Sequence, residues 1–525
     1  MQCTCVRQTD LPNTSKLYSD LVYNFDRLKD LYPWPPNDLR SISAASKFDF
    51  PRERRAALVR ALEPLNHGNP SLDAIARPDT VAIVTGQQVG LFSGPAYTVY
   101  KALTAIRIAQ DLTDSGTPAV PVFWLATEDH DFAEVNHAWV FGADYQPRRL
   151  AVASDAENGH RPVGDLRVPE WPLDALRDAL AGLPFAEEAL DLICKAYQPG
   201  ATMGSAFAQF IREVFGSYGL LIVDPMAPDF RKLAAPILSE AVDRMPEFIP
   251  ALKERGKELV ERGYHAQVLV DDDTSLVFLL ENGRRIPLRR SNGNYVAQTR
   301  RISASELAAD GARLSPNALL RPVVQDFMLP TAAYVGGPAE LAYLAQSRVL
   351  YERLLGRQPV AFPRAGFTLI DERAHKKMER YGLAPTNLLT GDQALIDFIG
   401  KRLIPSELRK RLDDTRASVS SALDTLSGDL HRFDITLAAA LETSRRKIEY
   451  QIGKIARKTA SEIMNKDQQA RRDALSLHGL VFPEKHLQER LYSIVPLLAR
   501  FGPGLVGEIH DAIRIECPDH QFAVV

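Results

Sequence analysis

The chain is 525 residues long, with 45% hydrophobic residues, 25% charged residues and a formal net charge of −3. This length predicts several substructures rather than one core. The composition is typical of folded soluble proteins and excludes disordered, collagen-like and membrane-embedded classes. The near-neutral charge predicts no general affinity for nucleic acid or acidic membranes.

The first ten residues lack the layout of a signal peptide, and no apolar run approaches the ~18 residues of a membrane span. We therefore expect a cytoplasmic protein. Its four cysteines, Cys3, Cys5, Cys194 and Cys517, are scattered without a C-x-x-C pair. That spacing is neither a disulfide framework nor a zinc site, so we assign them no role.

The first regular elements predict a strand–helix–strand unit. Residues 81–84 are a β-branched apolar run, residues 95–112 an amphipathic helix that starts at Pro95, and residues 120–126 a second apolar run. The loops that follow parallel strands joined by a crossover emerge at one edge of the sheet. The turn at residues 86–94 and the acidic segment at 128–131 should therefore converge.

Further strand candidates lie at residues 220–223, 332–335 and 359–362, with a helix over 339–355. Together these elements predict an α/β core built on a parallel sheet. Residues 142–200 mix short strands with helices, and residues 264–300 alternate like antiparallel strands around Asn282-Gly283 and Asn292-Gly293, both favoured hairpin turns. We interpret these two regions as insertions that form walls over the sheet edge.

From residue 408 apolar residues recur at steps of four and three, which is the rhythm of a coiled coil. Asp434 is the expected N-cap of a second helix that continues to about residue 466. We predict an antiparallel helical hairpin that projects from the core and supports a homodimer. The expected division is a core over residues 1–400 with insertions near 142–200 and 230–320, the hairpin over 401–475, and a segment over 476–525 that returns to the core.

The first cluster with chemical potential is the turn between the first strand and its helix. Its glycines expose backbone N–H groups at a helix N-terminus, which suits a carboxylate or phosphate, although they could merely permit a tight turn. Amides at a strand end are poor core residues and favour binding. The predicted substrate contacts here are Thr85, Gly86, Gln87, Gln88, Gly90, Gly94 and Tyr97.

The second cluster, at residues 128–131, places three carboxylates and an imidazole at a strand end. An imidazole beside carboxylates can relay protons near neutrality, so we predict His130 as the base, with Asp129 and Asp131 as further catalytic candidates. Asn136 is a predicted substrate contact. Helix caps and salt bridges are one alternative. A metal site is another, although no H-E-x-x-H spacing is present.

The third cluster flanks the strand at residues 332–335. The turn after this strand resembles the turn at residues 86–94, because its glycines are followed by a proline at a helix start. Glu340 and Tyr343 are three residues apart on the expected helix and should both lie near the mouth of the site, although Tyr343 could equally belong to the core. The predicted substrate contacts are Arg321, Gln325, Asp326, Gly336, Gly337, Glu340 and Tyr343.

With these clusters the chain resembles the bacillithiol biosynthesis cysteine-adding enzyme family, also called the cysteine ligase BshC family. The most specific strings are T-G-Q-Q-x-G-L-F-x-G-P-x-Y-T at residues 85–98, P-V-F-W-x-A-x-E-D-H-D-F at 121–132 and R-P-x-x-Q-D-x-x-L-P-T-x-A-Y-V-G-G-P-x-E at 321–340. The resemblance implies a Rossmann-like core with inserted connecting segments, a coiled-coil domain that supports dimerisation, and addition of cysteine to glucosaminyl-malate, the last step of bacillithiol biosynthesis.

The family core is similar to class I aminoacyl-tRNA synthetases, yet neither an H-I-G-H nor a K-M-S-K-S signature is present. The cofactor is therefore left open, with ATP or another nucleotide as the candidate. Two other functions compete with ligation: a metal-dependent hydrolase built on Glu128 to Asp131, and a non-catalytic adaptor that recruits partners through its coiled coil.

Overall fold

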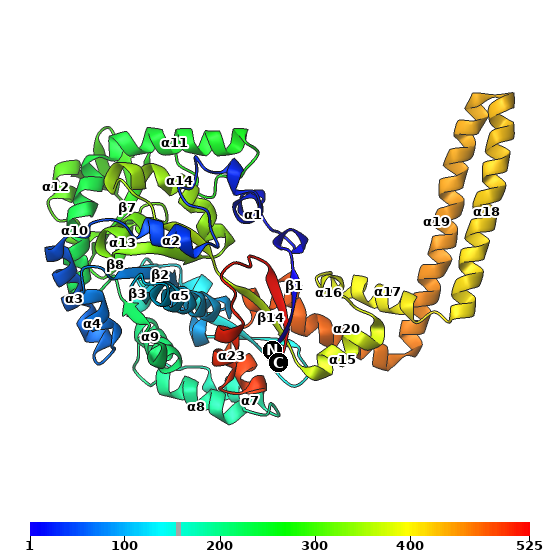
Figure 1. Cartoon of the computed structure of the whole chain (residues 1–525), viewed down its shortest axis with the longest axis horizontal. Coiled ribbons are helices and arrows are strands. Elements are labelled where there is room, and N and C mark those ends of the chain that lie inside the picture. Colours follow the sequence, from blue (N-terminus) through cyan, green and yellow to red (C-terminus); the bar gives the residue numbers. More distant parts are fainter. Residues whose placement is uncertain (154–158) are drawn as a thin grey trace.

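The computed structural model describes residues 1–153 and 159–525. Its centre is a five-stranded sheet in the order β13-β12-β2-β3-β6, of which β2 and β3 are labelled in Figure 1. Every pairing in it is parallel, which confirms the predicted α/β fold class. The strands are β2 (Val81–Gln87), β3 (Ala119–Leu125), β6 (Leu221–Val223), β12 (Thr331–Gly336) and β13 (Val360–Pro363).

Helices cover both faces of this sheet. Along β2, Ala82 and Val84 join a core formed with α10 (Pro228–Asp243), α11 (Met245–Glu261) and α14 (Pro338–Leu354), while Val81 and Ile83 face α5 (Tyr97–Asp114). Successive side chains of a strand point to opposite faces. Burial on both faces explains why the strands read as continuous apolar runs.

The helix after β2 begins later than predicted. Pro95 forms an isolated bridge with Ser493 instead of opening α5, and the Ala96 N–H donates to the Tyr492 carbonyl at 2.7 Å. The chain between Gly90 and Ala96 is therefore held by the C-terminal segment. This contact, from residues about 400 positions away, could not be seen in the local sequence.

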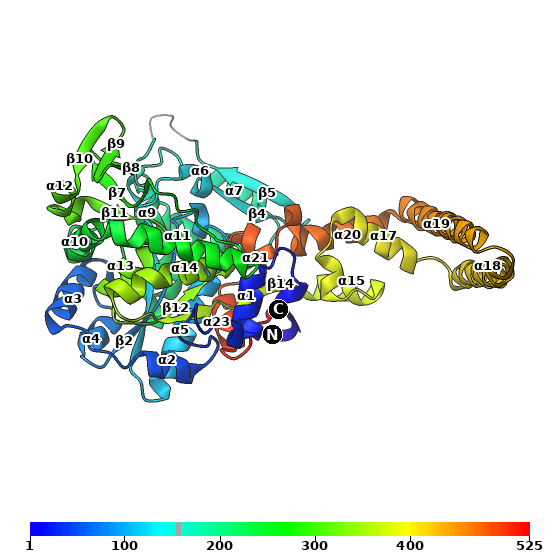
Figure 2. The ribbon, with the colours of Figure 1, turned by 90° about the horizontal axis from the view of Figure 1, so that it is seen from above.

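The second predicted insertion forms an antiparallel sheet in the order β10-β9-β8-β7-β11 (Figure 2). Asn282 and Gly283 have φ values of 53° and 70°, and the turn at Asn292 and Gly293 is likewise left-handed, as predicted for both hairpins. The strands are β7 (Thr274–Glu281), β8 (Arg284–Ser291), β9 (Asn294–Ala297), β10 (Arg300–Ser303) and β11 (Leu314–Pro316).

The first insertion follows β3 in the chain. It mixes short strands with helices, as expected. Its elements are α6 (Phe132–Val135), β4 (His137–Phe141), β5 (Pro147–Ala151), α7 (Leu173–Leu180), α8 (Ala186–Ala196) and α9 (Met203–Phe215).

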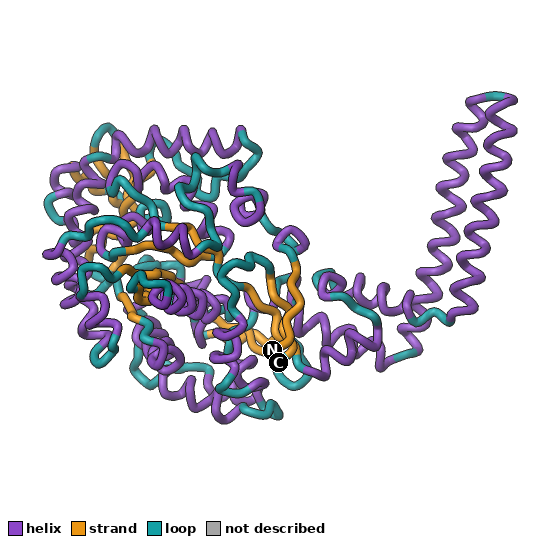
Figure 3. Tube along the Cα trace, viewed as in Figure 1, coloured by secondary structure: helices purple, strands orange, loops and turns teal. Residues whose placement is uncertain are grey.

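The helical hairpin consists of α18 (Ser406–Phe433) and α19 (Ile435–Lys466), which project far from the rest of the molecule (Figures 1 and 3). The Asp434 carboxylate accepts a hydrogen bond from the Thr436 N–H at 2.7 Å, so it is the predicted N-cap. At the base of α19, Ala460 and Met464 are buried beside α17 (Asp392–Arg402). Among the described helices, none has the length and apolar character needed to cross a bilayer.

A third sheet was not predicted. It joins β1 (Gln2–Val6), β15 (His520–Val524) and β14 (Gly366–Ile370) in the order β1-β15-β14, so the two ends of the chain lie side by side. The remaining α-helices are α1 (Lys16–Tyr23), α2 (Leu39–Ala45), α3 (Arg52–Asn66), α4 (Ser71–Ala76), α12 (Ala304–Ala308), α13 (Arg321–Met328), α15 (Glu372–Tyr381), α16 (Pro385–Leu388), α20 (Gln468–Val481), α21 (Gln488–Leu491), α22 (Val495–Phe501) and α23 (Leu505–Ala512).

Candidate active site

A cavity of about 810 Å³ lies at the carboxyl edge of the parallel sheet. Ligands of open α/β sheets commonly bind at this edge. Segments after β2, β3 and β12 line it together with the antiparallel sheet and α21. The predicted residues among its lining are Gly86, Gln87, Gln88, Tyr97, Asp129, His130, Asp131, Arg321, Gly337, Glu340 and Tyr343.

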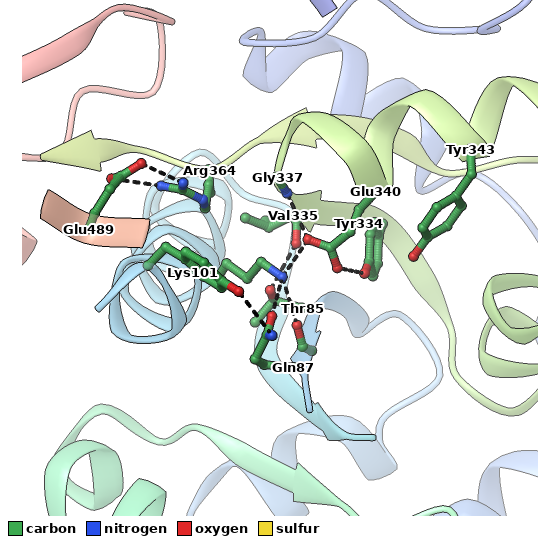
Figure 4. Close-up of polar contacts among 12 residues, drawn as sticks. Thr85, Gln87, Lys101, Tyr334, Val335, Gly337, Glu340, Tyr343, Arg364 and Glu489 are labelled. Carbon is green, nitrogen blue, oxygen red and sulfur yellow. Dashed lines mark hydrogen bonds and ion pairs between the residues drawn. The ribbon is translucent and has the colours of Figure 1, made fainter. Parts of the chain in front are cut away.

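The other predicted contacts lie outside this lining. Thr85 is buried and donates from Oγ1 to the Val335 carbonyl at 2.8 Å, which ties β2 to β12 (Figure 4). Gly90 and Gly94 line a neighbouring cavity of about 490 Å³. Asn136 contacts His137 of that second cavity, with Oδ1 3.2 Å from Nδ1. Gln325, Asp326 and Gly336 lie behind the wall of the main cavity.

A buried ion pair forms the floor of the main cavity. Lys101 on α5, 2% exposed, pairs with Glu340 on α14 and donates to the Gly86 carbonyl at 3.0 Å and to Oε1 of Gln87 at 2.8 Å (Figure 4). Burial lowers the pKa of Lys101, and the Glu340 carboxylate opposes that effect. Glu340 also accepts from the Tyr334 hydroxyl at 2.7 Å. The pair therefore fixes the ends of β2 and β12 relative to each other.

Close packing of β2 against β3 requires glycine at the start of the first turn. A Cβ atom at Gly86 would lie 2.8 Å from the Trp124 carbonyl oxygen, a backbone atom of β3. Any side chain there would separate the two strands.

Arg321, at the start of α13, is a cation without an acidic partner in the part of the chain that the structure describes. Its guanidinium donates to Oε1 of Gln325 at 3.0 Å and to the hydroxyls of Tyr334 and Tyr343 at 3.2 and 3.1 Å. All of these partners are neutral at physiological pH. Gln325 thus positions Arg321 from behind, and the free charge suits a carboxylate or phosphate.

The acidic turn after β3 is held by hydrogen bonds and ion pairs. Glu128 is 3% exposed and accepts from the Ser315 hydroxyl at 2.7 Å. Asp129 accepts from Nε2 of Gln88 at 2.6 Å, and the same amide donates to Glu134 at 2.7 Å. Asp131 caps α6 by accepting from the Glu134 N–H. The expected caps and salt bridges are therefore present at this turn.

His130 contacts Arg285 of β8 across the cavity. Burial lowers the pKa of His130, the positive charge of Arg285 lowers it further, and the carboxylates of Asp129 and Asp131 oppose both effects. His130 is therefore neutral at pH 7, as a base must be. Arg285 itself stacks on Phe278, with its guanidinium carbon 3.9 Å from the ring centroid.

Several cavity residues were missed by the sequence analysis: Lys101, Glu134, Arg285, Arg364, His486 and Arg490. Lys101 stands one helical turn after Tyr97, so helical spacing could have revealed it. Arg364 forms a buried pair with Glu489 of α21, at 2.9 and 2.5 Å (Figure 4). The arginines come from distant segments, and no short-range pattern connects them with the glycine turn.

No group of three or more His, Cys, Asp or Glu side chains is arranged to hold a metal ion within residues 1–153 and 159–525. The carboxylates of the acidic turn are instead committed to amide, hydroxyl and guanidinium partners. The hydrolase alternative is therefore not favoured.

Family models cover almost the whole chain. Residues 1–365 match the model described as Bacillithiol biosynthesis BshC, N-terminal Rossmann-like domain, and residues 367–525 match the corresponding C-terminal coiled-coil domain. The chain belongs to the BshC family. Membership confirms the resemblance found in the sequence, together with its Rossmann-like and coiled-coil parts.

Relatives of this BshC chain extend over its full length. A protein of Solibacter usitatus is 52% identical, with 100% of both chains covered. Proteins of Koribacter versatilis and Salinibacter ruber are 34% and 29% identical, covering 98% and 97% of this chain and 98% and 96% of their own. All three carry the name "Putative cysteine ligase BshC".

Proposed function

We propose that the protein is a cysteine ligase that forms an amide bond between cysteine and the amine of glucosaminyl-malate, the last step of bacillithiol biosynthesis. The names of its full-length relatives support ligation. The observation that carries the proposal is the cavity at the sheet edge, where Arg321, which has no acidic ion-pair partner among the described residues, and the neutral His130 face the same space. Those two groups meet the needs of an anionic acyl substrate and of an amine nucleophile.

Direct condensation of a carboxylate with an amine is unfavourable in water, so the cysteine carboxyl must first receive a leaving group. ATP or another nucleotide would supply it. Arg321 is the group of this chain that suits the resulting anion. In the predicted glycine turn, the N–H groups of Gly90, Ser93 and Gly94 donate instead to Gln88, Tyr197 and Leu91. The other predicted contacts, among them Gln87, Gln88 and Tyr97, surround that position.

In the proposed step the amine nitrogen attacks the carbonyl carbon of the activated cysteine. The amide bond forms as the leaving group departs with its bonding electrons, and the proton on nitrogen passes to His130. Arg285 occupies Nδ1 of His130 in the free protein. A substrate anion that attracts Arg285 would free the lone pair on Nδ1 of His130. His130 could then accept a proton when substrate is present. Asp129 and Asp131 orient the neutral amine by accepting hydrogen bonds from its N–H groups.

The test is incubation of the pure protein with cysteine and glucosaminyl-malate, with and without ATP, and identification of products by mass. A product with the mass of the cysteine adduct supports the proposal, and its dependence on ATP identifies the activating group. Absence of adduct under all conditions contradicts it. An adaptor would give no adduct, and stoichiometric metal with hydrolysis products would indicate the hydrolase.

We also propose that the protein works in the cytoplasm as a homodimer joined through α18 and α19. The hairpin exposes large apolar side chains on a rod that carries no core of its own: Leu426, Phe433, Ile435, Leu437, Ile448, Tyr450 and Ile455. Such surfaces commonly mark contacts between proteins.

A further inference from the structure

The neighbouring cavity of about 490 Å³ is continuous with the main one, because the two share lining residues. Gln87, Gln88, Tyr97 and Arg490 are among the residues that border both. These shared residues form the boundary between two compartments, which we call the waist. The function proposed above places its reaction in the main compartment and assigns no substrate group to the second, which Gly90 and Gly94 help to line.

Strand β4 presents one face to the second compartment. His137, Ala138 and Trp139 line it; the side chains of His137 and Trp139 are partly exposed, whereas Ala138 and Val140 are buried. The period of two along a strand puts both partly exposed side chains on one side. Asn136 lies against His137 and fixes its ring. The compartment therefore has an aromatic wall with a hydrogen-bonding imidazole beside it.

Another segment beside this compartment is held in an unfavourable backbone conformation. Glu484 and Lys485 have φ values of 50° and 62°, in the left-handed region that residues other than glycine avoid. This turn brings Glu484 and His486 to the compartment. Strained backbone of this kind persists where surrounding structure holds it, commonly at binding sites.

The two compartments differ in their cations. Lys101, Arg285, Arg321 and Arg364 line only the main one, where they stand beside the carboxylates of Glu128, Asp129, Asp131 and Glu340. The second has the carboxylates of Glu134 and Glu484, and its only Lys or Arg within the described residues is Arg490, at the waist. A phosphorylated or nucleotide group would meet more negative than positive charge there. A neutral ring with many hydroxyl groups would find an aromatic face, carboxylate acceptors and imidazoles.

We propose that the second compartment binds the pyranose ring of the acceptor substrate, with Trp139 against the ring face and Glu134 and Glu484 accepting from its hydroxyls. This inference rests on the proposed function. In a 2-amino sugar the amine and the glycosidic oxygen are on adjacent ring carbons. If the ring edge that carries these two groups faces the waist, the amine therefore points toward Asp129 and His130. The malate carboxylates then lie within reach of Arg490, which has no hydrogen bond or ion pair from its side chain among the described residues.

The experiment measures binding of glucosaminyl-malate to the full chain by calorimetry, which requires no turnover. Trp139→Ala should weaken this binding roughly tenfold, a loss of about 1.4 kcal/mol, while Trp139→Phe keeps most of it because a flat ring remains. Malate alone should bind the wild type and Trp139→Ala equally. Trp34→Phe, a tryptophan outside both compartments, is the matched control and should bind like the wild type.

Unchanged affinity of Trp139→Ala for glucosaminyl-malate would overturn the inference. The inference would also be overturned if Trp139→Ala lost affinity for cysteine or ATP instead, because the compartment would then bind another substrate. A wild type that does not bind glucosaminyl-malate also overturns it. Binding that depends on Trp139 without any cysteine adduct would leave the sugar site standing and contradict only the proposed reaction.

Discussion

Arg285 and His130 face each other across the cleft, with Nη1 of the arginine 3.2 Å from Nδ1 of the histidine. A guanidinium can only donate, so Nδ1 is the acceptor and the proton of the neutral imidazole is on Nε2. The strand that bears Arg285 belongs to the antiparallel insertion. This insertion therefore controls the protonation of a residue on the parallel sheet.

We predict that Arg285→Met moves the acidic limb of the pH profile of kcat/KM to higher pH. Removing the positive charge favours protonated His130, so its pKa rises and a smaller fraction is neutral at a given pH. The profile should be measured between pH 5 and 9. Arg284→Met, at the exposed neighbouring position, is the control and should leave the limb in place. An unmoved limb in Arg285→Met would show that His130 does not act as the base.

His130→Ala and Gln88→Ala should affect different kinetic constants. Loss of a general base is expected to lower kcat by a factor of about 10² to 10⁴ with substrate binding retained. Gln88 donates to both Asp129 and Glu134, so its removal should loosen the turn and mainly raise KM. Steady-state kinetics with both substrates distinguishes these results. Near-normal turnover in folded His130→Ala would make the base assignment wrong.

Lys101→Met should destabilise the protein by about 3 kcal/mol, because it leaves the Glu340 carboxylate without its buried partner. Lys101→Met combined with Glu340→Gln should recover part of this loss, since the glutamine can still accept from the Tyr334 hydroxyl. Urea denaturation of the wild type, both single variants and the double variant gives the coupling energy. Additive effects would mean that the two side chains do not stabilise each other.

Removal of residues 412–453, replaced by a short polar loop, should halve the sedimentation mass. The truncation keeps Ala460 and Met464, whose contacts with α17 stabilise the base of the hairpin. Thermal unfolding of the truncated chain checks that the core is intact. A full-length chain that is already monomeric at micromolar concentration, or a truncated chain that stays dimeric, would contradict the proposed dimer.

The free energy of unfolding should fall between pH 6.5 and pH 4 in a manner that depends on His520. Burial lowers the pKa of His520 to about 4 from 6.5, so the unfolded chain binds its proton first and stability decreases as the pH falls. Full protonation corresponds to about 3 kcal/mol. His520→Gln should flatten this dependence in urea titrations. An equally steep dependence in the variant would assign it to other groups.

Local sequence was sufficient for the framework of the site. Strand, glycine turn and helix are contiguous in residues 81–114 and again in 331–354, so the presence and order of β2, β12 and their helices could be predicted, although β2 extends to Gln87 and α5 begins only at Tyr97. The convergence of Gln88 with Asp129 followed from the common edge of parallel strands.

The charged side chains that line the cavity could not be predicted from local sequence. Arg285 reaches the cleft from an insertion, and Arg490 from a helix near the C-terminus. Their places depend on tertiary packing between segments far apart in the chain. The structural roles of Gln325 and Thr85 could not be predicted either, because sequence alone does not distinguish a polar residue behind the cavity wall from one that lines the cavity.

The small sheet β1-β15-β14 determines the order in which the molecule can be completed. Strand β1 pairs with β15, which follows it in the chain after all the other described strands and helices. The Arg364–Glu489 pair likewise waits for α21. A nascent chain therefore carries an unpaired β1 and an open cleft until α21 and β15 have been synthesised. Contacts of such long sequence separation slow folding, so refolding should be limited by the docking of this last segment.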